Sequence, residues 1–145
     1  MTHDEFVGQV QARARLASRG AAEAAIRAVF ETLAERLQSA TADHLAAQLP
    51  QELARHLRSD VEFQRLSADE FLRRVCEREG PHVELPDSVY HARGVIEVLE
   101  EAVPPGIIEK VRASLPSEFQ RLFESGSKGQ LKKQEREVPE KEKER

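Results

Sequence analysis

Apolar residues recur along the chain at the spacing of an α-helix. The clearest stretch runs from residue 22 to residue 37, where apolar side chains follow one another at helical intervals of three, four or one. Its members are Ala22, Ile26, Val29, Phe30, Leu33 and Leu37, and a matching stripe is formed by Ala92, Val95, Ile96, Leu99 and Val103. A half-buried strand would alternate apolar and polar residues instead. The pattern predicts one long amphipathic helix in each half of the chain.

Shorter helices are expected before and after each long one. Thr2 with Glu5, and Ser67 with Glu70, have the spacing of capping boxes, which mark the start of a helix. Later in each half a leucine precedes a proline, at Leu49-Pro50 and at Leu115-Pro116. Proline has no amide proton and restricts the residue before it, but it fits the first turn of a new helix. We expect these two dipeptides to be structural corners between short helices.

The two halves also resemble each other in sequence. Three blocks of the first half recur in the same order in the second half. The block pairs are residues 2–6 with 67–71, 27–33 with 93–99, and 49–53 with 115–119. The offset in numbering grows by one between the first pair and the other two, which a single insertion in a loop explains. Three ordered matches with one gap indicate an internal duplication.

These patterns predict an all-α fold. We expect an internally duplicated helical bundle, in which two similar halves of about four helices each share one core. Residues 1–125 would form a single domain made of two repeats, 2–63 and 67–124. Residues 126–145 are expected to be a disordered charged tail, because Leu131 and Val138 are the only large apolar side chains after Ser127.

Composition agrees with a packed domain and argues against two classes of partner. Leu, Ile, Val and Phe make up 36 of 145 residues, enough for a core. The net charge is −4, and residues 128–145 carry +2, so the remaining body carries −6. A body of that sign does not favour nucleic acid. No apolar run is long enough to span a bilayer, and the acidic start at Asp4 and Glu5 does not resemble a secretion signal, so we expect a cytoplasmic protein with no membrane partner.

The sequence shows no known catalytic signature, so no catalytic residue and no cofactor are predicted. Phosphate-binding glycine loops, a nucleophile elbow and a zinc-protease helix are all missing. Cys76 is the only cysteine, and the five histidines are scattered, so no metal site is expected. His44 and His56 are the best-placed histidines, on neighbouring helices across the first leucine-proline corner.

One polar arrangement occurs twice. Arg27 precedes Glu31 by four residues, and Arg93 precedes Glu97 by four, each beside the apolar stripe of a long helix. Such pairs can bridge along the helix or reach a neighbouring turn. The structural interpretation is that they tie the long helix to the short ones. The functional interpretation is a possible polar interaction site, in which the two arginines recognise an anion or an acidic partner.

The run Leu33-Ala34-Glu35-Arg36-Leu37, the segment from His44 to Pro50, and the second copy ending Leu115-Pro116-Ser117-Glu118-Phe119 resemble the bacterial domain-of-unknown-function family 2267. The resemblance extends from Asp4 to Phe123. It implies a compact, all-helical bacterial protein of the cytoplasm, and it brings no reaction, cofactor or catalytic residue.

Two functional hypotheses follow. The first is a non-enzymatic helical module that binds a protein partner or a second copy of itself. The alternative is a small-ligand-binding protein or an enzyme that uses a cleft between the two halves.

Overall fold

The computed structural model describes residues 1–58 and 60–124, and all regular secondary structure within them is helical. The elements are α1 (His3–Arg13), α2 (Arg19–Arg36), α3 (Ser39–Ala46), α4 (Gln51–Leu57), α5 (Ala68–Glu79), α6 (Leu85–Ala102), α7 (Pro105–Ala113), the short 3₁₀ helix η1 (Ser117–Phe119) and α8 (Gln120–Glu124). The predicted all-α class is confirmed for this part of the chain. The predicted tail, residues 126–145, lies outside the described residues.

Both predicted capping boxes are present. The Thr2 hydroxyl accepts a hydrogen bond from the Glu5 amide at 3.1 Å, and the Glu5 carboxylate accepts one from the Thr2 amide at 2.8 Å. Ser67 and Glu70 form the same two bonds at the same distances at the start of α5. These bonds satisfy amides that have no partner in the first turn of a helix. The bond from the Thr2 backbone also lowers the pKa of Glu5.

Prolines stand where the short helices meet. α3 ends at Ala46, and Pro50 is the residue immediately before α4, with its carbonyl accepting the first helical bond from Leu53 at 3.0 Å. Pro116 precedes η1 in the same way, and its carbonyl accepts from Phe119 at 3.0 Å. The leucines of these corners point inward to different extents: Leu115 is buried and Leu49 is half-buried.

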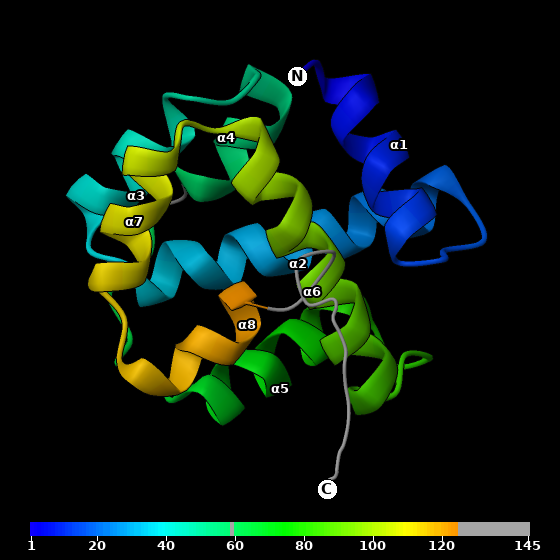
Figure 1. Ribbon diagram of the computed structural model, residues 1–145. Coiled ribbons are helices and arrows are strands. Elements are labelled where there is room, and N and C mark those ends of the chain that lie inside the picture. Colours follow the sequence, from blue (N-terminus) through cyan, green and yellow to red (C-terminus); the bar gives the residue numbers. More distant parts are fainter. Residues whose placement is uncertain (59, 125–145) are drawn as a thin grey trace, which may run out of the picture.

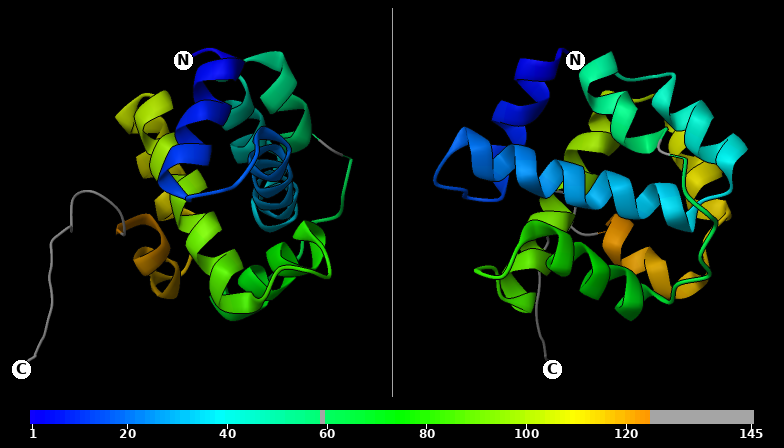
Figure 2. Two further views of the ribbon diagram at one scale, coloured as in Figure 1. Left: turned by 90° about the vertical axis from the view of Figure 1, so that its right-hand side faces the viewer. Right: turned by 180° about the vertical axis from the view of Figure 1, so that it is seen from behind.

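The two long helices cross in the middle of the molecule. Figure 1 shows α6 in front of α2, with α1 and α4 above the crossing and α5 and α8 below it. α1 contacts both α2 and α6, and α5 also contacts both of them, while α3 lies against α7. The view from behind in Figure 2 shows α2 running across the whole width of the molecule. The long helices therefore support most of the shorter ones directly, whereas α7 packs against α3.

Buried apolar side chains from α1 to α8 form one continuous cluster. Two edge-to-face phenylalanine pairs lie within it, Phe6 with Phe30 at 5.9 Å between ring centroids and Phe71 with Phe119 at 5.7 Å. Such contacts favour a fixed geometry over a loose apolar core.

α1 and α6 approach each other closely at one point. A Cβ atom placed on Gly94 of α6 would lie 3.3 Å from the Cβ of Ala14, directly after α1. That separation is shorter than an ordinary carbon–carbon contact. Glycine at this position therefore lets the two helices cross at short range.

Within the described ranges, no helix combines the length and the apolar character needed to cross a lipid bilayer.

Candidate functional site

A groove of about 900 Å³ lies between α1, α2 and α4. We call it the α1–α4 groove, and its lining residues all come from the N-terminal half of the chain. They are His3, Val7, Gly20, Glu23, Ala24, Ile26, Arg27, Gln51, Glu52, Leu53, Arg55 and His56. The floor contains the buried apolar side chains Val7, Ile26 and Leu53. Charged and polar side chains surround this floor, so the groove can contact both apolar and charged parts of a ligand.

Two arginines face the groove from different helices. Arg27 comes from α2 and Arg55 from α4, and both residues are exposed. The Nε of Arg55 donates a hydrogen bond to the Glu52 carbonyl at 3.3 Å. Neither guanidinium forms an ion pair with a carboxylate in the part of the chain that the structure describes. Arginine presents five N–H donors, so both side chains retain donors for a ligand.

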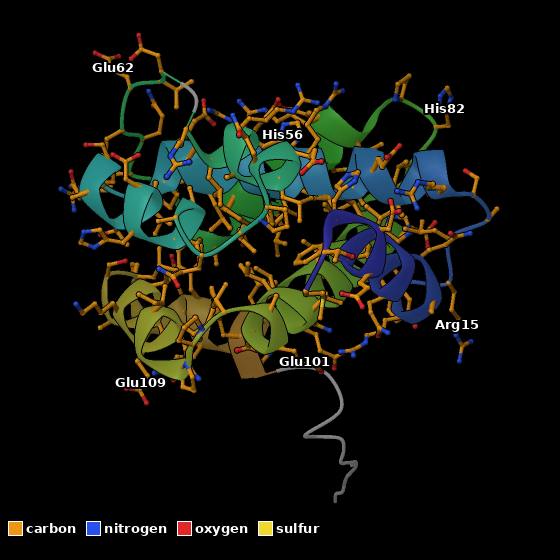
Figure 3. The ribbon with its side chains drawn as sticks, turned by 90° about the horizontal axis from the view of Figure 1, so that it is seen from above. Arg15, His56, Glu62, His82, Glu101 and Glu109 are labelled. Atoms are coloured by element: carbon orange, nitrogen blue, oxygen red, sulfur yellow. The ribbon has the colours of Figure 1, made fainter. Side chains whose placement is uncertain are left out.

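Two histidines also line the groove, His3 from α1 and His56 from α4. Burial lowers the pKa of His56, and the nearby charge of Arg55 lowers it further. The His56 ring is consequently neutral at neutral pH. Figure 3 shows His56 on α4, at the edge of the molecule opposite Glu101. His44, the other histidine favoured by the sequence, is exposed on α3 and does not line the groove.

The acidic groups around the groove differ in their partners. Arg19 lies 2.6 Å from the Asp4 carboxylate and 3.8 Å from that of Glu23. Asp4 also lies 3.8 Å from the ring of His3. Glu52 forms no ion pair with another described residue. Glu52 is therefore the groove's carboxylate that is open to a ligand.

The glutamates of the two predicted pairs lie elsewhere. Glu31 of α2 is 3.7 Å from Arg78 of α5, and Glu97 of α6 accepts a hydrogen bond from Arg13 of α1 at 3.1 Å. The sequence suggested partners on the same helix or on a neighbouring turn. The structure instead gives both glutamates a partner from the other half of the chain, because α1 crosses α6 and α5 crosses α2.

The arginines of the predicted pairs therefore have different surroundings from their glutamates. Arg27 faces the α1–α4 groove, together with Glu52. Arg93 is exposed on α6 and forms no ion pair with another described residue. The four predicted residues do not meet in one site: Glu31 and Glu97 belong to two separate ion-pair clusters, and Arg27 belongs to the groove.

The sequence model of a family described as "Uncharacterized conserved protein (DUF2267)" matches residues 3–122. The chain belongs to the DUF2267 family. The match begins with α1 and ends within α8, so the α1–α4 groove and both arginine–glutamate clusters lie inside the family region. No curated protein matches the chain.

A buried polar cluster closes the α5–α6 corner of this DUF2267 chain. The Glu79 carboxylate, whose side chain is 3% exposed, accepts a hydrogen bond from the Ser88 hydroxyl at 2.7 Å. Its other oxygen lies 2.8 Å from Nδ1 of His91. Both carboxylate oxygens thus have a partner, which is what a buried charge requires. No sequence pattern pointed to this cluster, because the equivalent positions of the first half are Ala14, Ala22 and Ala25.

In residues 1–58 and 60–124 of the DUF2267 chain, no three His, Cys, Asp or Glu side chains gather as a metal site would need. Cys76 is a half-buried free thiol whose sulfur donates a hydrogen bond to the Val83 carbonyl at 3.3 Å. This hydrogen bond therefore joins α5 to the segment before α6, at the same corner as the Glu79 cluster.

Proposed function

We propose that this DUF2267 chain is a non-enzymatic helical module that binds a partner protein, and that the α1–α4 groove is its binding surface. The observation that carries the proposal is the pair Arg27 and Arg55, which face one groove from two helices without a carboxylate partner among the described residues. Surface arginines with open donors are frequent contact residues in protein interfaces. The apolar floor supplies the remaining contact area.

The rest of the described surface offers few apolar contacts. Its exposed large apolar side chains are Met1, Val61 and Tyr90, which lie at the N-terminus, in the α4–α5 connection and on α6. Large apolar patches are typical of obligate interfaces. A partner of the described part of this chain is therefore expected to be recognised mainly through polar groups, and the groove is where such groups converge.

We further infer that the two halves arose by internal duplication. Three features support it. The helices of the halves have similar lengths in the same order, α1 to α4 and α5 to α8. Both halves open with a capping box. Arg13 and Arg78, which occupy equivalent positions of the two halves, pair with glutamates at equivalent positions of the opposite half. A common core for the two halves follows from this crossed arrangement.

Site-specific photo-cross-linking tests the binding proposal. A photoreactive phenylalanine analogue replaces Ala24, which lines the groove, or Tyr90, the equivalent position of the second half. We expect irradiation of cells of the native host to yield a reproducible protein adduct from position 24 that position 90 does not give. An adduct with a second copy of the chain would identify self-association. No specific adduct from position 24 would overturn the proposal.

A second candidate function is small-ligand binding. The volume of the groove lies within the range of small-molecule sites, about 300 to 1,000 Å³. Such sites are mostly apolar and enclose their ligand, whereas this groove is open and lined by many charged groups. A thermal-shift screen of metabolites against the full chain distinguishes the two functions: stabilisation by one metabolite that Arg27→Ala abolishes would favour the small-ligand hypothesis.

A further inference from the structure

Some of the charged side chains that face the α1–α4 groove have an ion-pair partner, and others have none among the described residues. On α2 and α4, Arg27 and Arg55 have no carboxylate partner in the described ranges. Among the carboxylates near the groove, Glu23 is engaged by Arg19, and Glu52 forms no ion pair with a described residue. Two cationic groups and one anionic group are therefore open to a ligand.

The charged groups further out already have ion-pair partners. Asp4 of α1 is engaged by Arg19 at 2.6 Å. Glu31 of α2, one turn beyond Arg27, lies 3.7 Å from Arg78. With His56 neutral, the charges of Arg19, Arg27 and Arg55 balance those of Asp4, Glu23 and Glu52. Protonation of His56 would add one positive charge to the same surface.

From this arrangement we infer that the groove receives an acidic segment of the partner protein, whose carboxylates pair with Arg27 and Arg55, and that binding becomes tighter as His56 gains a proton. The inference rests on the proposed function and specifies the chemistry of the partner. Arginine binds carboxylates through two parallel hydrogen bonds, which gives such a contact both strength and direction. The apolar floor accommodates a side chain between two acidic residues of the segment.

The chain's own C-terminal residues do not fit this role by charge. Residues 128–145 contain seven basic and five acidic side chains, so they carry the same sign as the open arginines. Charge complementarity therefore favours an acidic segment from another molecule.

The test uses the full chain and fluorescent peptides of roughly ten residues, long enough to cross a groove of this size. One peptide alternates glutamate with serine, and its control carries glutamine in place of each glutamate. Fluorescence anisotropy at fixed ionic strength measures the dissociation constants. We expect the acidic peptide to bind at least about tenfold more tightly than the glutamine peptide, and more tightly by about threefold or more when the pH is lowered from about 7.5 to about 5.5.

The chain supplies a matched control for charge. Arg93 and Arg121 are exposed, and they occupy the positions of the second half that are equivalent to Arg27 and Arg55. We expect the double variant Arg27→Glu with Arg55→Glu to weaken peptide binding by about tenfold or more, and Arg93→Glu with Arg121→Glu to change it by less than about threefold. Equal losses in the two double variants would mean that the peptide senses only total charge, which would overturn the assignment to the groove.

Two further measurements test the pH dependence of binding and the size of the ligand. The variant His56→Gln should remove the gain in affinity at low pH, and an unchanged pH profile would overturn the role of His56. Succinate or inorganic phosphate binding as tightly as the peptide would identify a small-anion site and overturn the peptide assignment. If position 24 gives a specific protein adduct but the acidic peptide does not bind, the proposed function stands and this inference fails.

Discussion

Arg13 of α1 holds the Glu101 carboxylate of α6 through two hydrogen bonds, of 2.6 and 2.7 Å, although the two residues come from opposite halves of the chain. On the other side of the molecule, Arg78 of α5 donates a hydrogen bond of 2.8 Å to Glu35 of α2. The two arginines are separated by the same offset as the sequence blocks 2–6 and 67–71, and the two glutamates by the same offset as the blocks 27–33 and 93–99. The first helix of each half is therefore tied to the long helix of the other half.

Removal of Arg78 is expected to destabilise the protein. Its Nη1 atom donates hydrogen bonds to the buried Thr32 hydroxyl and to the Glu35 carboxylate, both at 2.8 Å. Arg78→Ala leaves these acceptors with fewer partners, so we expect the free energy of unfolding to fall by about 1–3 kcal/mol in urea denaturation. The control is Arg73→Ala on the exposed side of α5, with an expected change below about 0.5 kcal/mol. A similar loss in both variants would contradict the assigned role of Arg78.

Acid should weaken the same contact between α2 and α5. Burial acts to raise the pKa of Glu35, but the hydrogen bonds and charges of Arg78 and Arg74 together outweigh it, so this pKa lies below its usual value of 4.5. A carboxyl with a lowered pKa stabilises the fold fully above the unfolded value, and this contribution disappears as the pH falls through the folded value.

We therefore expect Glu35→Gln to flatten the decline of stability with acidification below pH 4.5, together with a lower stability at neutral pH. Urea denaturation curves across the acid range measure both effects. The exposed residue Glu62 provides the matched control, because Glu62→Gln should leave the acid slope unchanged.

Two glycines are expected to respond to alanine in opposite directions. Gly8 lies on the exposed side of α1, and a Cβ there would have no atom within 4 Å, so Gly8→Ala should stabilise the protein by about 0.5–1 kcal/mol. Gly80 ends α5 with a φ of +128°, which a residue with a side chain adopts only with strain. Gly80→Ala should therefore destabilise it by about 1–2 kcal/mol. Thermal denaturation of the two variants checks the signs, and destabilisation by Gly8→Ala would contradict the account of α1.

The buried cluster at Glu79 should show strong coupling. Glu79→Ala removes the acceptor of the fully buried Ser88 hydroxyl, and an unpaired buried hydroxyl costs about 1–3 kcal/mol. Adding Ser88→Ala removes that orphaned group. We expect the double variant to be more stable than Glu79→Ala alone, as measured by urea denaturation in a double-mutant cycle. Additive losses would show that the hydrogen bond contributes nothing to stability.

Binding of an acidic peptide should be coupled to proton uptake. Burial and Arg55 lower the pKa of His56, so its ring is neutral at neutral pH, and nearby peptide carboxylates would raise that pKa again. Calorimetric titrations in two buffers of different ionisation enthalpy should report net proton uptake near pH 6.5, the usual pKa of histidine. The uptake should fall in His56→Gln. Identical enthalpies in both buffers, after correction for dilution, would show that no proton is taken up.

Local sequence signals predicted much of the fold. The apolar stripes of α2 and α6, and the capping boxes at Thr2 and Ser67, depend on residues within one or two turns of each other. Such short-range patterns report helix boundaries and the buried face of a helix directly.

The partners of Glu31 and Glu97 could not be read from those patterns. Each lies four residues after an arginine on its own helix, which is the strongest local signal for an ion pair. The observed partners, Arg78 and Arg13, are brought close by the crossing of helices from different halves. Arg13 and Arg78 are separated by the same offset as the sequence blocks 2–6 and 67–71, a signal that sequence reasoning missed. Local patterns could not predict the groove either, because His3 lies beside α4 only once α1 is folded against α2.

The close approach of Gly94 to Ala14 has a consequence for ligand recognition. α1 is both a wall of the groove and the helix fastened to α6 at this crossing. A larger side chain at position 94 would require the Ala14 end of α1 to shift by a few tenths of an ångström. A substitution in the C-terminal half can thus shift a helix that forms a wall of a groove in the N-terminal half, and so alter affinity without touching the ligand.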